Sequence, residues 1–134
     1  MYRFEKLEVW KLAIKYGNKV YEFVETLPKS EEFGLKSQLR RASLSISSNI
    51  AEGSGSSSVK DFCKFLDIAI KSTIETASQL MFARERGYIT DAKLRELYQE
   101  SEILVKKVQG LKQYLKRPRA TTYNQQPGME VLHD

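Results

Sequence analysis

The sequence predicts an all-α protein, an antiparallel up-down-up-down four-helix bundle. Apolar residues recur at steps of three or four in four successive segments, whereas no segment shows the alternation of a strand. The connections between these segments are short, so neighbouring helices must run antiparallel. The 134 residues, 41% of them hydrophobic, suffice for one domain with a modest core. We expect the bundle over residues 1–117 and a flexible tail over residues 118–134.

The first two helices are predicted over about residues 5–27 and 31–53. The first carries one apolar stripe, and Pro28 ends it because the residue before a proline is disfavoured in the helical conformation. The second carries a stripe of apolar and small residues, with Gly34 as an alternative start.

The third helix is predicted over about residues 58–86, after a turn rich in glycine and serine. Ser58, followed three residues later by Asp61, is typical of a capped helix start. Gly87 suits the left-handed position past the helix end.

The fourth helix is predicted over about residues 90–117, with Thr90 as its cap and Pro118 as its stop. The remaining residues mix Thr, Asn, Gln, Pro and Gly without periodicity, which predicts the flexible tail.

The third helix has more apolar residues than one core stripe needs, which predicts that another copy of the chain covers its second side. Single exposed apolar residues are normal on protein surfaces, and this explains any one of them but not the whole helix. The expected oligomer interface comprises Trp10, Leu44, Phe65 and Ile68.

A polar strip follows one side of the second helix. It comprises Gln38, Arg41, Ser45, Asn49 and Glu52, which share one side at 100° steps. The strip has three interpretations: a hydrogen-bonded seam between helices, a pairing of the Arg41–Glu52 kind within or between chains, or a ligand site. Buried polar groups must find partners, which favours the structural interpretation.

The end of the fourth helix has a dense run of cations, and the whole chain has a net charge of +5. No acidic residue interrupts the run between Lys106 and Arg119. Such a run suits contact with phosphates, although cations also stabilise helix C-termini. The candidate nucleic-acid contacts are Arg40, Arg41, Lys106, Lys107, Lys112, Lys116 and Arg117. Lys60, Lys64 and Lys71 either extend this surface or form a solvated face.

Catalytic and metal-binding chemistry lack candidate residues. The only histidine, His133, lies in the predicted tail, and no carboxylate pairs with a histidine at the spacing of a di-iron site. The single cysteine, Cys63, lies among apolar residues and cannot form an internal disulfide. We therefore expect no enzyme activity, no cofactor and no metal. The sequence also has no signal peptide and no apolar run long enough for a membrane span, which predicts a cytoplasmic protein.

Several motifs resemble a known bacterial family of four-helix bundles. They are Leu7-Glu8-Val9-Trp10, Phe33-Gly34-Leu35, Gln38-Leu39-Arg40-Arg41-Ala42, Ser45-Ile46, Asn49-Ile50-Ala51-Glu52-Gly53 and Phe65-Leu66-Asp67-Ile68-Ala69. Their order and spacing resemble the 23S rRNA intervening-sequence proteins, also named S23 ribosomal proteins. Two positions depart from the family pattern: Ser56 stands where a basic residue is usual, and Lys71 where a glycine is usual.

The resemblance implies bundles that assemble into rings, commonly pentamers, and a suspected role in binding RNA. It also implies kinship with accessory proteins of diversity-generating retroelements, which bind nucleic acid and a reverse transcriptase. The expected function is that of an oligomeric RNA-binding module. The alternative is a protein-interaction scaffold that docks another protein, such as a polymerase.

Overall fold

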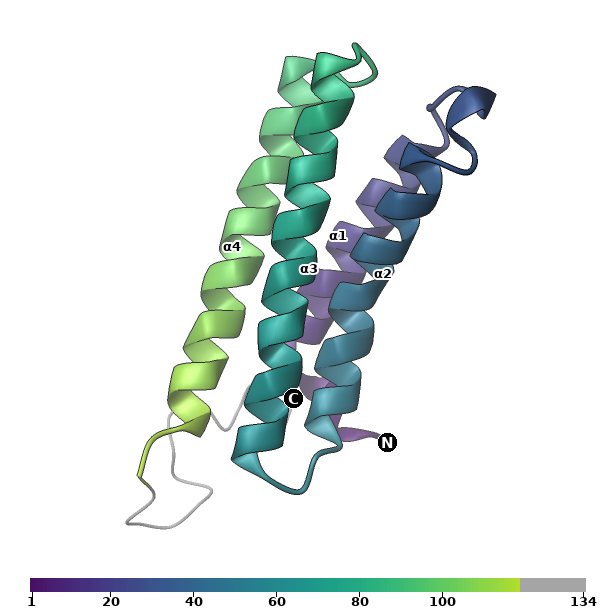
Figure 1. Ribbon diagram of the computed structural model, residues 1–134. Coiled ribbons are helices and arrows are strands. Elements are labelled where there is room, and N and C mark those ends of the chain that lie inside the picture. Colours follow the sequence, from purple (N-terminus) through teal and green to yellow (C-terminus); the bar gives the residue numbers. More distant parts are fainter. Residues whose placement is uncertain (119–134) are drawn as a thin grey trace.

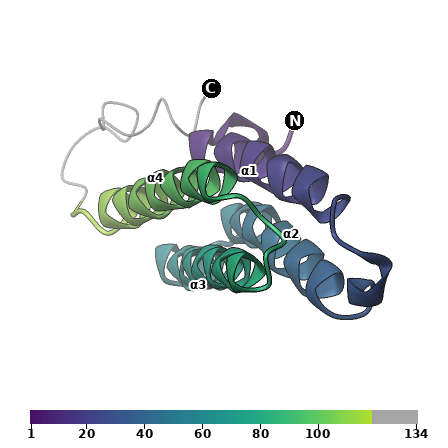
Figure 2. The ribbon, with the colours of Figure 1, turned by 90° about the horizontal axis from the view of Figure 1, so that it is seen from above.

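The computed structural model describes residues 1–118, which form four long helices and two short 3-10 turns. The elements are η1 (Arg3–Lys6), α1 (Glu8–Val24), η2 (Lys29–Glu31), α2 (Leu35–Ser54), α3 (Val59–Glu85) and α4 (Asp91–Leu115). The helices run alternately up and down (Figure 1), and seen from above they occupy four corners, with α3 between α2 and α4 (Figure 2). The predicted all-α bundle is confirmed. The predicted tail lies, except for Pro118, outside the described residues.

The first two helices start later than predicted. α1 begins at Glu8 because residues 3–6 form a separate 3-10 turn and Leu7 is extended, with φ −79° and ψ 126°. α2 begins at Leu35 because residues 29–31 form a second 3-10 turn after Pro28. Gly34 is the N-cap of α2, so the alternative start that the sequence offered is the correct one.

Side chains cap the last two helices as predicted. The hydroxyl of Ser58 accepts a hydrogen bond of 3.1 Å from the backbone N–H of Asp61. The hydroxyl of Thr90 accepts one of 3.1 Å from the N–H of Lys93. Between these helices Gly87 has a φ of 75°, the left-handed conformation that glycine adopts without strain.

The core fills the space between the four helices. Each helix contributes fully buried apolar side chains at helical spacing, as the stripes in the sequence predicted. The largest of them include Tyr16, Val20, Leu39, Ile46, Ile50, Leu66, Leu80, Leu97 and Leu104.

The contact between α2 and α3 is close because α2 presents small residues to α3. A Cβ atom on Gly53 would lie 2.7 Å from Cβ of Phe65 and 3.0 Å from Cδ1 of Phe62. Further along the same contact, the hydroxyls of Ser45 and Ser72 form a hydrogen bond of 2.9 Å. The absence of a side chain at position 53 thus sets how closely α3 approaches α2.

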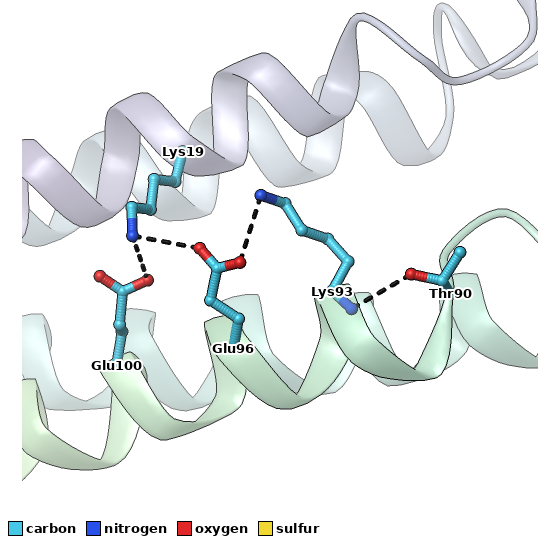
Figure 3. A network of polar contacts seen from close by, with 5 residues as sticks. All are labelled: Lys19, Thr90, Lys93, Glu96 and Glu100. Atoms are coloured by element: carbon cyan, nitrogen blue, oxygen red, sulfur yellow. Dashed lines mark hydrogen bonds and ion pairs between the residues drawn. The ribbon is translucent and has the colours of Figure 1, made fainter.

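Ion pairs join α1 to α4. Nζ of Lys19 lies 3.0 Å from Glu100 and 3.1 Å from Glu96, and Lys93 approaches Glu96 at 3.6 Å (Figure 3). The hydrogen bond to Glu100 is the main cause that raises the pKa of Lys19, and the hydrogen bond from Lys19 lowers the pKa of Glu96. These carboxylates of α4 therefore face α1.

Within residues 1–118, no helix combines the length and apolarity that crossing a bilayer requires.

Candidate nucleic-acid interface

The seven predicted phosphate contacts lie in two separate regions of the bundle. Arg40 and Arg41 lie near the start of α2, at the end that carries the connection from α1. The other five residues lie between Lys106 and Arg117, along the half of α4 that leads to the opposite end (Figure 1). The two groups therefore do not form one continuous surface.

Three of the predicted contacts are engaged in ion pairs, and two of these pairs lie away from the contact between α3 and α4. Arg40 pairs with Glu32 at 3.3 Å, in the connection before α2. Lys107 pairs with Glu8 of α1 at 3.3 Å, so it leans toward the side of α4 that faces α1. Arg41 is exposed and has no carboxylate partner among residues 1–118.

The remaining cations of α4 lie on its other flank or at its end. Lys112 pairs with Asp67 of α3, which places it on the side of α4 that faces α3. Lys116 follows Lys112 by four residues and so continues the same side of the helix. Lys106 is exposed and borders a groove between α3 and α4. The guanidinium of Arg117 lies 6.0 Å from the ring centre of Tyr114.

Three lysines of α3 lie next to these cations of α4. Lys60, Lys64 and Lys71 are spaced by four and seven residues and share one exposed face of α3. Asp67 falls on the same face, and its ion pair with Lys112 joins that face to α4. The helical spacing of these lysines was visible in the sequence, but the side of the bundle on which they lie was not.

We call this region the lysine surface. It comprises Lys60, Lys64 and Lys71 of α3 and Lys106, Lys112 and Lys116 of α4. On α4, the lysine surface lies on the side away from Glu96 and Glu100, whose carboxylates face Lys19 of α1. Along α4, Glu96 and Glu100 thus lie toward α1, while Lys112 and Lys116 lie toward α3.

The four residues predicted at an oligomer interface differ in their exposure. Leu44 and Ile68 are 55% and 44% exposed. Trp10 is half-buried and makes an edge-to-face contact with Phe4, with ring centres 4.9 Å apart. Phe65 is half-buried beside Gly53 in the contact between α2 and α3. Leu44 and Ile68 are thus the two with most surface available to another chain.

The polar strip of α2 separates into a part in the helix contact and a part in solvent. Asn49 donates hydrogen bonds to the carbonyl and the hydroxyl oxygen of Ser45, at 2.8 and 2.9 Å, and Ser45 in turn bonds Ser72 of α3. Gln38 and Glu52 are exposed. The inner part of the strip therefore joins α2 to α3.

The described residues contain no group of three or more His, Cys, Asp or Glu side chains that could hold a metal ion. Cys63 is buried. His133 lies outside the described part of the chain. The buried hydroxyl of Tyr16 has no hydrogen-bond partner within residues 1–118, and burial, aided by the charge of Glu100, raises its pKa.

Comparison with known proteins identifies one family. Residues 5–110 match the family described as 23S rRNA-intervening sequence protein. The crystal structure of a protein of unknown function from the S23 ribosomal protein family of Bacteroides thetaiotaomicron has the same fold, with a TM-score of 0.73. The match covers 78% of this chain and 95% of that one, at 24% sequence identity. No curated protein matches the sequence.

Proposed function

Because the chain belongs to the family of 23S rRNA-intervening sequence proteins, we propose that it is a non-enzymatic, self-associating module that binds RNA through its lysine surface. The family description gives the proposal its direction toward ribosomal RNA. The arrangement of charge on α3 and α4 gives it a location on this chain.

The observation that carries the proposal is the concentration of lysines on one side of the bundle. Six lysines from two neighbouring helices lie on this side, and Asp67 takes part in the ion pair that links the two helices. Phosphate contacts need cations that are accessible and not already paired. Five of the six lysines, all but Lys112, are exposed and have no carboxylate partner among residues 1–118, and we choose Lys64, Lys71 and Lys116 to sample both helices.

The test is a charge-reversal variant with a matched control. The variant carries Lys64→Glu, Lys71→Glu and Lys116→Glu, and its affinity for a 23S rRNA fragment is measured by fluorescence anisotropy over a range of salt concentrations. Each lost phosphate contact lowers the slope of log K against log salt by about 0.7 to 0.9, so we expect weaker binding and a slope smaller by about 2.

The control variant carries Lys11→Glu, Lys15→Glu and Arg41→Glu, which changes the net charge by the same amount on α1 and α2. We expect it to lose much less affinity than the first variant, because all three positions lie outside the lysine surface. Equal losses in both variants would show that only net charge matters. A larger loss in the control would move the site to the α2 side of the bundle.

Self-association is the second part of the proposal. Leu44 and Ile68 are large apolar side chains in contact with solvent, and such surfaces are stabilised by burial against another chain. The family resemblance suggests a ring, with five copies as the first number to test. We expect Leu44→Asp with Ile68→Asp to lower the mass measured by light scattering, while a mass equal to that of the wild type would refute this interface.

A protein-interaction scaffold is the alternative function. It is supported by Phe33 and Phe82, aromatic side chains that are 96% and 56% exposed; Phe33 precedes α2, and Phe82 lies near the end of α3, away from Lys60 and Lys64 at its start. In this case a stable assembly would ignore RNA at physiological salt. Light scattering with and without the rRNA fragment separates the two functions, because only the RNA-binding module gains mass.

A further inference from the structure

A groove lies between α3 and α4, directly beside the lysine surface. Its volume is about 420 Å³, and its wall is mostly apolar, with Ile74 and Met81 from α3 and Tyr98 from α4. Ser78 and Glu102 supply polar groups, and Lys106 borders the groove. An apolar hollow with a few polar groups is the usual form of a site that holds a small molecule.

Several apolar side chains that line this groove are exposed to solvent and do not belong to the core. Ile74, Met81 and Tyr98 are 58%, 43% and 40% exposed. One exposed apolar residue is ordinary, but three from two helices converge on the same hollow. An apolar group of a ligand that binds in the groove would therefore cover apolar surface that is otherwise in contact with water.

The lysines beside the groove favour a ligand with an anionic group next to its apolar part, while Glu102 adds one negative charge to the wall. Lys106 belongs to the groove and to the lysine surface, and Lys71 lies two residues before Thr73, which also lines the groove. Nucleotides combine a flat base with a charged phosphate. In duplex RNA the bases are stacked and paired, whereas in single strands they can turn outward and stack on aromatic side chains.

We infer that the groove binds one unstacked base of a single-stranded RNA segment, against the ring of Tyr98, while the flanking phosphates lie on the lysine surface. This inference rests on the proposed function and adds the form of RNA to it. The carboxylate of Glu102 only accepts hydrogen bonds, so it favours a base that presents two adjacent donors. Guanine has such a pair, N1–H and the exocyclic amino group, whereas the N3–H of uracil is flanked by two carbonyl oxygens.

The test compares Tyr98→Ala with Tyr98→Phe, which retains the ring. Affinities for a short single-stranded RNA and for a duplex of the same sequence are measured by fluorescence anisotropy. We expect Tyr98→Ala to weaken single-strand binding about tenfold, the effect of losing one stacked base, and to leave duplex binding unchanged. Tyr98→Phe should bind both forms as the wild type does, and the salt dependence should be the same in all three proteins because no phosphate contact is lost.

A second measurement does not depend on the stability of the Tyr98 variants. The RNA carries guanine or uracil at one position in an otherwise constant strand, and binding is compared for the wild type and Glu102→Gln, a change at an exposed site. We expect the wild type to prefer guanine and Glu102→Gln to lose part of that preference.

Three results would overturn the inference. Unchanged single-strand affinity in Tyr98→Ala, together with the loss expected from the lysine reversals, would remove the base site and leave the proposed function standing. A lower particle mass for Tyr98→Ala in light scattering would show that the groove is covered by a second copy of the chain. Failure of the wild-type protein to bind either RNA form would refute the proposed function and the base site together.

Discussion

Replacement of Gly53 by alanine tests how the bundle is packed. The new Cβ atom would lie 2.7 Å from Cβ of Phe65, about 1 Å less than the usual separation of two carbon atoms. Cβ of Phe65 cannot move without the backbone of α3, so the two helices must separate. Overpacking of this kind costs about 1 to 3 kcal/mol, while alanine gains about 1 kcal/mol over glycine in helix propensity. Because the misfit is against near-backbone atoms, we expect a net loss of about 2 kcal/mol.

Gly110 provides the matched control, since it also lies within a helix but has no neighbour within 4 Å of an added Cβ. Gly110→Ala should stabilise the protein by about 0.5 to 1 kcal/mol, from propensity alone. Urea denaturation of both variants at equal protein concentration measures the free energy of unfolding. If Gly53→Ala were as stable as Gly110→Ala, the close approach of α2 and α3 would be refuted.

Three further predictions concern single residues. Ser58→Ala removes the cap of α3 and should lower the free energy of unfolding by about 1 kcal/mol in urea denaturation, whereas Ser58→Asp should retain most of it. Gly87→Ala, at a φ of 75°, should cost about 1 to 2 kcal/mol through backbone conformation alone, and an unchanged stability would show that the turn adopts another conformation. Lys19 lowers the pKa of Glu96, so this ion pair stabilises the fold above the ordinary pKa of the carboxyl and ceases to do so as pH falls through the lowered value. Thermal unfolding from neutral to acidic pH should therefore show a smaller loss of melting temperature for Lys19→Met than for the wild type, and equal losses would exclude the pair as a source of acid sensitivity.

Much of the fold could be predicted because the four helices are specified by local signals. Ser58 and Thr90 are capping residues followed by helix-forming segments, and Gly87 is a helix-ending glycine. The starts of the first two helices could not be predicted as well. Residues 3–6 and 29–31 form 3-10 turns that are too short for a periodic pattern to reveal, so α1 and α2 begin later than the sequence predicts.

The candidate site was only partly predictable because its residues come from two helices. The run of cations from Lys106 to Lys116 was evident in the sequence, but the side chains of consecutive residues on a helix point in different directions. Lys107 leans toward Glu8 and Lys112 toward Asp67, a distinction that depends on which helices flank α4. The groove beside Tyr98 was also invisible in the sequence, since its walls are more than fifteen residues apart along the chain.

Two of the contacts between helices differ in the polar interactions that reinforce the apolar core. Gly53 and the Ser45–Ser72 pair make α2 and α3 meet through steric fit and uncharged hydroxyls, whereas Lys19 joins α1 to α4 through charge. Dissolved ions screen the second kind of contact and leave the first nearly unaffected. Ionic strength therefore weakens the contact between α1 and α4 more than the contact between α2 and α3. Added salt should raise amide hydrogen exchange first in the turns of α4 that carry Glu96 and Glu100. Salt titrations of ligand binding thus report two effects together: a weaker contact between α1 and α4 and the release of counterions.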